Sequence, residues 1–154
     1  MSDLYRLGIG IMMINQNEQV FVAERIKPKG AWQMPQGGID KNESPKKALY
    51  REAMEEMGTN NFSIITASKN WYQYDFPLIY QNKWFNGKYR GQKQKWFLLK
   101  FLGDDNEINI NLYIPEFADW KWIDINKLEN IIVDFKKSMY KKISDEFKKI
   151  IVKI

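Results

Sequence analysis

Apolar residues occur in short runs separated by polar turns along most of the chain. Residues 5–14 and 20–24 flank the polar segment 15–19, which predicts a β-hairpin. Further runs rich in β-branched and aromatic residues predict strands at 62–74, 93–102, 107–110 and 120–123. Most of the chain is therefore expected to be sheet and loop.

Two segments have helical character instead. Ser44 is a good N-cap, Pro45 suits the first helical position and Gly58 ends the pattern, so a helix is expected over 45–57. A second amphipathic helix is expected from about Asp134. Its apolar positions recur every four residues, at Phe135, Met139, Ile143, Phe147 and Ile151.

The remaining sequence predicts one domain. Residues 86–93 carry glycines and basic residues in an expected loop, and there is no internal repeat or interdomain linker. Residues 1–154 are therefore expected to form a single domain. The longest apolar run, 7–14, is far shorter than the ~20 residues that span a bilayer, and the N-terminus does not resemble a signal peptide. We expect no membrane span and a cytoplasmic location.

Composition narrows the possible chemistry. Cysteine and histidine are both absent, which excludes disulfides, thiolate nucleophiles and the usual ligands of zinc. Any metal must be held by oxygen, which favours Mg²⁺ or Mn²⁺ over zinc. The net charge of +5 is compatible with a polyanionic partner, although a lysine-rich surface also serves solubility.

The first expected helix concentrates negative charge. Glu52, Glu55 and Glu56 project to one side of it, while a separate apolar stripe comprises Leu49, Ala53 and Met57. Crowded carboxylates near a helix C-terminus are unfavourable without a cation. Arg51, four residues before Glu55, is one such cation, and Mg²⁺ is the stronger candidate.

The glutamates belong to a longer pattern. Its seven fixed positions are Gly37, Glu43, Arg51, Glu52, Glu55, Glu56 and Gly58. This spacing is that of the Nudix box, G-x5-E-x7-R-E-U-x-E-E-x-G-U, in which U is apolar, and the sequence therefore resembles the Nudix hydrolases. Two U positions depart from the pattern, because Ala53 is small and Thr59 is polar.

The resemblance implies an α/β fold, a three-layer α/β/α sandwich with a central mixed sheet, in which the box forms a loop-helix-loop. It also implies that the box glutamates bind a divalent metal. Water then attacks phosphorus in a substrate with a phosphoanhydride bond. Metal ions support such chemistry by neutralising phosphate charge and lowering the pKa of water.

The resemblance extends beyond the box. The matching stretches are AWQMPQGGID, NW at residues 70–71, GQKQKWFLL, PEF with WKW, and FKKSMYKKISDEF. Together they resemble the bacterial RNA 5′-pyrophosphohydrolases, a subfamily that includes dinucleoside polyphosphate hydrolases. Such enzymes remove pyrophosphate from the 5′ end of RNA, and the 5′-monophosphate left behind starts mRNA decay.

The resemblance also assigns roles to residues. It implies that the metal ligands or catalytic base are Glu52, Glu55, Glu56 and Glu116, with a backbone carbonyl from Gly37. Structural support of the box falls to Gly38, Glu43, Arg51 and Gly58. Val133 and Phe135 match the family's site for the first base, where an aromatic face can stack on any base.

Three basic residues are candidates for phosphate contacts. Lys93 and Lys95 alternate on one side of an expected strand, and Arg6 is a third candidate. Each is equally compatible with an ordinary surface position.

Three functions stay open at this point. They are an RNA 5′-pyrophosphohydrolase, a diadenosine tetraphosphate hydrolase and a non-catalytic RNA-binding Nudix module. The expected partner is accordingly an RNA 5′ end or a dinucleoside polyphosphate. The intact set of acidic residues disfavours the non-catalytic module. Oligomeric state, a monomer included, and any protein activator stay open.

Overall fold

The computed structural model describes residues 4–153. Its strands are β1 Tyr5–Ile14, β2 Val20–Arg25, β3 Trp32–Gln33, β4 Gln36–Gly38, β5 Phe62–Asp75, β6 Gly91–Phe101 and β7 Phe117–Ile123. Its α-helices are α1 Pro45–Met57, α2 Leu78–Gln81, α3 Leu128–Ile131 and α4 Lys137–Ile151. Short 3₁₀ helices are η1 Trp84–Gly87, η2 Asp105–Glu107, η3 Ile125–Lys127 and η4 Asp134–Lys136.

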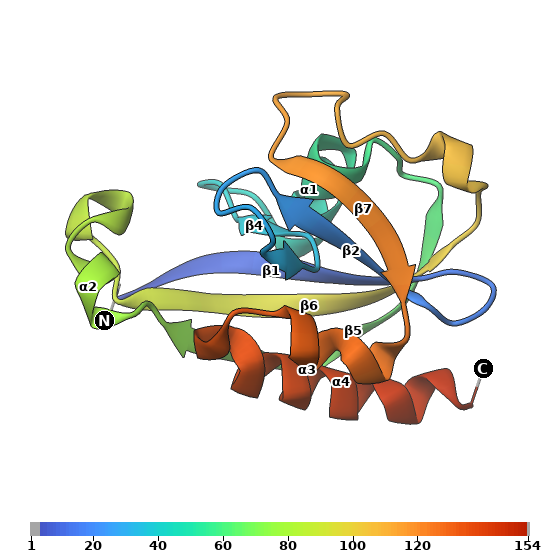
Figure 1. Cartoon of the computed structure of the whole chain (residues 1–154). Coiled ribbons are helices and arrows are strands. Elements are labelled where there is room, and N and C mark those ends of the chain that lie inside the picture. The colour runs from blue at the N-terminus through green and yellow to red at the C-terminus, as the bar shows by residue number, and fades with distance from the viewer. Residues whose placement is uncertain (1–3, 154) are drawn as a thin grey trace.

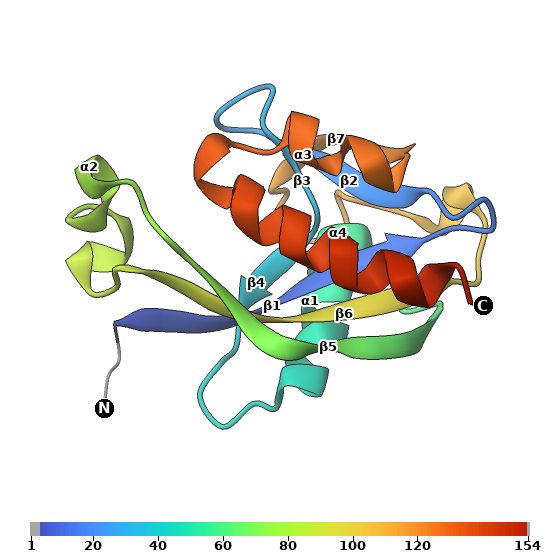
Figure 2. The ribbon, with the colours of Figure 1, turned by 90° about the horizontal axis from the view of Figure 1, so that it is seen from below.

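The strands form one mixed sheet. Their order is β3-β2-β1-β6-β5, with β4 added beside β1 and β7 beside β2. Strands β1 and β6 run parallel, and the other pairs are antiparallel. Helix α1 covers one face, and α3 and α4 cover the other, as Figures 1 and 2 show. The expected three-layer α/β/α sandwich is confirmed.

Alternation along β1 divides the core between the two faces. Ile9, Ile11 and Met13 are buried on the side of α1, whereas Met12 and Ile14 pack on the side of α4. This is the period-two geometry of a strand covered on both faces. No helix within residues 4–153 is long and apolar enough to cross a membrane.

Most expected elements are present with small shifts at their ends. Helix α1 has the expected bounds, Ser44 accepts a hydrogen bond from the backbone N–H of Lys47, and Gly58 ends it with φ +70°. The hairpin of β1 and β2 is also confirmed. The expected loop 86–93 is wrong at its end, because Gly91 already begins β6.

Two expectations need larger correction. Residues 107–110 do not form a strand: Asp104 and Glu107 build a capping box around η2, and Ile108 and Ile110 pack into the core without a partner strand. The last helix does not begin as an α-helix at Asp134, because η4 precedes α4. The short elements β3, β4, α2 and α3 lack a strong periodic signal in the sequence.

Candidate functional site

The glutamates of α1 lie at the junction between the helix and β4. Glu52 and Glu56 are 8% and 3% exposed, so both are buried rather than solvated. The backbone N–H of Gln36 donates to Glu56 Oε2 at 3.1 Å, whereas Glu56 Oε1 is buried without a partner among residues 4–153. A buried carboxylate oxygen with no donor is costly unless a cation neutralises it.

Burial and mutual repulsion make these carboxylates hard to ionise. Burial is the main cause that raises the pKa of Glu52 to about 7, despite the opposing hydrogen bond from Arg51. Burial also raises the pKa of Glu56 well above its ordinary value, and the charges of Glu52 and Glu116 add to the effect. The charge of Glu116 therefore acts on both buried glutamates, although Glu116 is itself exposed.

Arg51 organises the loop before α1. Its guanidinium donates to both carboxylate oxygens of Glu43 at 2.8 Å and to the Gly38 carbonyl at 2.7 Å. The hydrogen bond from Arg51 is the main cause that lowers the pKa of Glu43 to about 2. These contacts tie the loop before α1 to the helix.

Arg51 also reaches the carboxylate cluster itself, as expected from its position four residues before Glu55. It donates to Glu52 Oε1 at 2.7 Å and to Glu55 Oε2 at 3.3 Å. Within residues 4–153, no three acidic side chains converge closely enough to form a ready-made metal cage. The donor set still fits a hard divalent cation, because it is all oxygen and includes the unpaired Glu56 Oε1.

Glycine is required where Glu52 approaches β4. A Cβ at Gly37 would lie 2.0 Å from the Glu52 carboxyl carbon. A Cβ at Gly38 would lie 2.1 Å from a guanidinium nitrogen of Arg6. The two adjacent glycines therefore make room for different side chains, Glu52 from α1 and Arg6 from β1.

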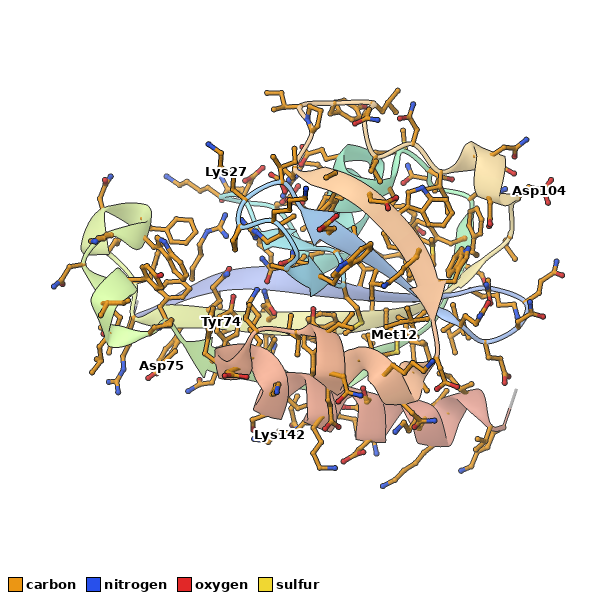
Figure 3. All side chains as sticks on the ribbon, in the orientation of Figure 1. Met12, Lys27, Tyr74, Asp75, Asp104 and Lys142 are labelled. Atoms are coloured by element: carbon orange, nitrogen blue, oxygen red, sulfur yellow. The ribbon has the colours of Figure 1, made fainter. Side chains whose placement is uncertain are left out.

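A cavity of about 720 Å³ opens beside this cluster. Four cations line it, namely Arg6, Arg25, Lys27 and Lys136, and none of its described lining residues is acidic. Its aromatic lining includes Trp32, Tyr74, Phe76, Trp84, Phe85 and Phe135. Lys27 and Tyr74, labelled in Figure 3, show that the wall draws on both the loop after β2 and strand β5. Gln36 also lines it, so the cavity adjoins the residue whose N–H contacts Glu56.

The structure separates the expected substrate residues into two groups. Arg6, Val133 and Phe135 all line the cavity. Lys93 and Lys95 do not, because alternation along β6 places them on the opposite face from Gln92, which does line it.

Several residues that line the cavity were not predicted from the sequence. They include Arg25, at the end of β2, and Lys136, which is buried and whose pKa burial lowers to about 8. The cluster of aromatic residues in 84–89 is an available signal, since exposed aromatic residues in a loop are unusual without a binding role.

The raised pKa values predict a pH dependence of stability. Because folded Glu52 binds its proton more tightly than the unfolded chain, the metal-free protein should lose stability as pH rises from 4.5 through about 7. Glu56 adds to the loss in the same direction. The opposite shift of Glu43 acts below pH 4.5, outside this window.

Urea unfolding in EDTA between about pH 5 and pH 7 measures this loss. The Glu52→Gln variant should show a smaller decline than the wild-type protein. An equal decline in both proteins would contradict the assignment of the loss to Glu52.

Comparison with known proteins agrees with this geometry. The NUDIX domain model matches residues 4–143. An RNA pyrophosphohydrolase of Orientia tsutsugamushi (strain Boryong) is 47% identical over 144 residues, covering 93% of this chain and 89% of that protein. One of Rickettsia typhi is 47% identical over 148 residues, covering 96% of this chain and 92% of that protein.

Solved structures show the same fold. The E. coli dihydroneopterin triphosphate pyrophosphohydrolase aligns with a TM-score of 0.73 at 16% identity, covering 94% of this chain and 99% of that chain. A C. elegans Ap4A hydrolase aligns with a TM-score of 0.64 at 18% identity, covering 92% and 98%. The chain therefore belongs to the Nudix family and, within it, to the same subfamily as the RNA pyrophosphohydrolases of Orientia and Rickettsia.

Proposed function

We propose that this protein is an RNA 5′-pyrophosphohydrolase that removes pyrophosphate, or successive phosphates, from tri- or diphosphorylated RNA. The observation that carries the proposal is a cationic, aromatic cavity that adjoins a buried carboxylate cluster. The basic side chains bind the 5′ phosphates, and the aromatic rings stack on the bases. The carboxylates catalyse the hydrolysis. The curated relatives at 47% identity support the same activity.

The carboxylate cluster is the proposed metal centre, with Mg²⁺ or Mn²⁺ as the cofactor. Its proposed ligands are Glu52, Glu55, Glu56, Glu116 and the Gly37 carbonyl. A bound divalent ion would neutralise the phosphate oxygens and leaving group and lower the pKa of the attacking water. A carboxylate of the cluster would accept the proton of the attacking water, and Arg51 keeps Glu52 and the loop in place.

The residues around the cavity hold the RNA in this proposal. Arg6 lies against Gly38 of β4 and contacts Gln92 at 3.2 Å, so it can reach phosphates near the cluster. Phe135 offers a half-buried ring at the cavity wall, and the centre of this ring lies 5.7 Å from that of Tyr74. The product, a 5′-monophosphorylated RNA, would start mRNA decay in the cytoplasm.

The direct test incubates the protein and 5′-triphosphorylated RNA with Mg²⁺ or Mn²⁺ and identifies the products. The proposal expects pyrophosphate or phosphate and a 5′-monophosphorylated RNA. RNA that keeps all its 5′ phosphates with either metal would contradict the proposal.

Replacement of Phe135 by alanine tests the base-stacking role. Loss of one base–aromatic stack should cost about 1–3 kcal/mol of transition-state stabilisation, which is measured as a lower kcat/KM on RNA. Thermal unfolding of the same variant shows whether lost packing against Tyr74 contributes. An unchanged kcat/KM would return Phe135 to a packing role.

A further inference from the structure

One part of the cavity wall takes no part in the contacts proposed for Arg6 and Phe135. Residues 76–89, here called the aromatic arm, leave the sheet after β5 and return to it before β6, and they contain α2 and η1. Figures 1 and 2 show the arm extending beyond the sheet near the start of β1. Four of its aromatic residues line the cavity, namely Phe76, Tyr80, Trp84 and Phe85.

Trp84 is the centre of a connected set of rings. It stacks on Tyr80 with centroids 4.5 Å apart and planes within 4°. It contacts Phe76 edge-on at 5.0 Å and lies 6.2 Å from Phe135. The proposed stacking site on Phe135 therefore continues directly into the arm.

Phe85 has an unfavourable backbone conformation, and the Arg6 guanidinium lies over its ring. Its φ is +53° and that of Asn86 is +59°, a conformation that non-glycine residues seldom adopt. The Arg6 guanidinium lies 4.6 Å from the centre of the Phe85 ring. Strained residues of this kind collect at binding sites, where the surrounding structure maintains them.

The exposure of these rings argues against a purely packing role. Trp84 is 36% exposed and Phe85 is 44% exposed, although both line a cavity. Four basic side chains also line the cavity, and none of its described lining residues is acidic. Aromatic faces beside a cationic track are the composition that binds single-stranded nucleic acid.

We propose that Trp84, backed by Tyr80, and Phe85, held by Arg6, form a second stacking surface for the RNA base that follows the base on Phe135. The inference rests on the proposed function and extends it to the substrate's length and form. An RNA of two or more nucleotides should therefore gain affinity from this surface, whereas a mononucleotide should not.

Binding without metal tests this surface separately from catalysis. Affinities are measured in EDTA for 5′-monophosphorylated RNAs of one and three nucleotides. Trp84→Ala should weaken trinucleotide binding about 10-fold or more and mononucleotide binding by less than about 2-fold. Trp84→Phe should restore most of the lost affinity.

Leu78→Ala is the matched control, because Leu78 is 81% exposed on the same arm and does not line the cavity. It should bind both RNAs as the wild-type protein does. Equal weakening of both RNAs by Trp84→Ala, or no weakening, would overturn the second stacking surface.

Hydrolysis of triphosphorylated RNA by the wild-type protein is measured in parallel. Absent hydrolysis with length-dependent loss of binding in Trp84→Ala would refute the proposed function and support the stacking surface. Normal hydrolysis without that loss would refute the stacking surface alone.

Discussion

Replacing Glu56 by glutamine should lower kcat by about 100-fold or more while the metal-free protein keeps or gains thermal stability. Glu56 is 3% exposed, and one of its carboxylate oxygens has no partner within residues 4–153. Ionising it in the metal-free protein is therefore unfavourable, and glutamine removes that cost. The catalytic cost follows because the proposed metal centre loses a charged ligand.

Steady-state kinetics and thermal unfolding with and without Mg²⁺ measure the two effects. Glu107→Gln is a suitable control, because this glutamate is exposed and contacts Asn61 outside the site. It should leave turnover unchanged. Near-wild-type turnover in Glu56→Gln would remove Glu56 from the proposed metal centre.

Replacing Gly37 by alanine should lower kcat by about 100-fold, the loss expected from misplacing a reacting group by about 1 Å. The added Cβ would meet the Glu52 carboxyl group at 2.0–2.3 Å. Because this group is the end of a flexible side chain, the collision moves Glu52 rather than the backbone. Thermal stability should therefore change much less than turnover.

Gly38→Ala provides the matched comparison. Its added Cβ would displace the Arg6 guanidinium instead, at 2.1 Å. Because Arg6 is assigned to substrate phosphates, this variant should mainly raise KM for RNA. Identical kinetic defects in the two variants would contradict the separate roles of Glu52 and Arg6.

The parts of the fold that the sequence predicted well carry local signals. Helix α1 has its N-cap, its first-turn proline and its C-terminal glycine, so both ends were predictable. The segment 107–110 shows the opposite case. Its alternating isoleucines resemble a strand, but burial against the core and a neighbouring capping box determine its conformation.

The candidate site likewise has a part that the sequence predicts and a part that it does not. The box residues follow a fixed spacing along one helix and its preceding loop, which sequence alone can show. The cavity instead joins β1, the β2–β3 loop, the aromatic arm and the segment before α4. Arg25 and Trp84 come to line one cavity only through that tertiary arrangement, so no spacing rule could have predicted them.

The difference between Arg6 and the two lysines of β6 has a similar cause. All three are basic residues on neighbouring parallel strands. Only the face of the sheet toward which each side chain points decides whether it lines the cavity, and the pattern of charges along the sequence does not specify which face holds the cavity.

The proposed activity is best tested by comparing kcat/KM for three substrates at equal concentration with Mg²⁺. They are 5′-triphosphorylated RNA, 5′-diphosphorylated RNA and diadenosine tetraphosphate. The proposed RNA pyrophosphohydrolase activity predicts a preference for one of the two RNAs, because the cavity offers successive aromatic rings beside four basic side chains. Preference for diadenosine tetraphosphate, or no turnover of any substrate, would contradict it.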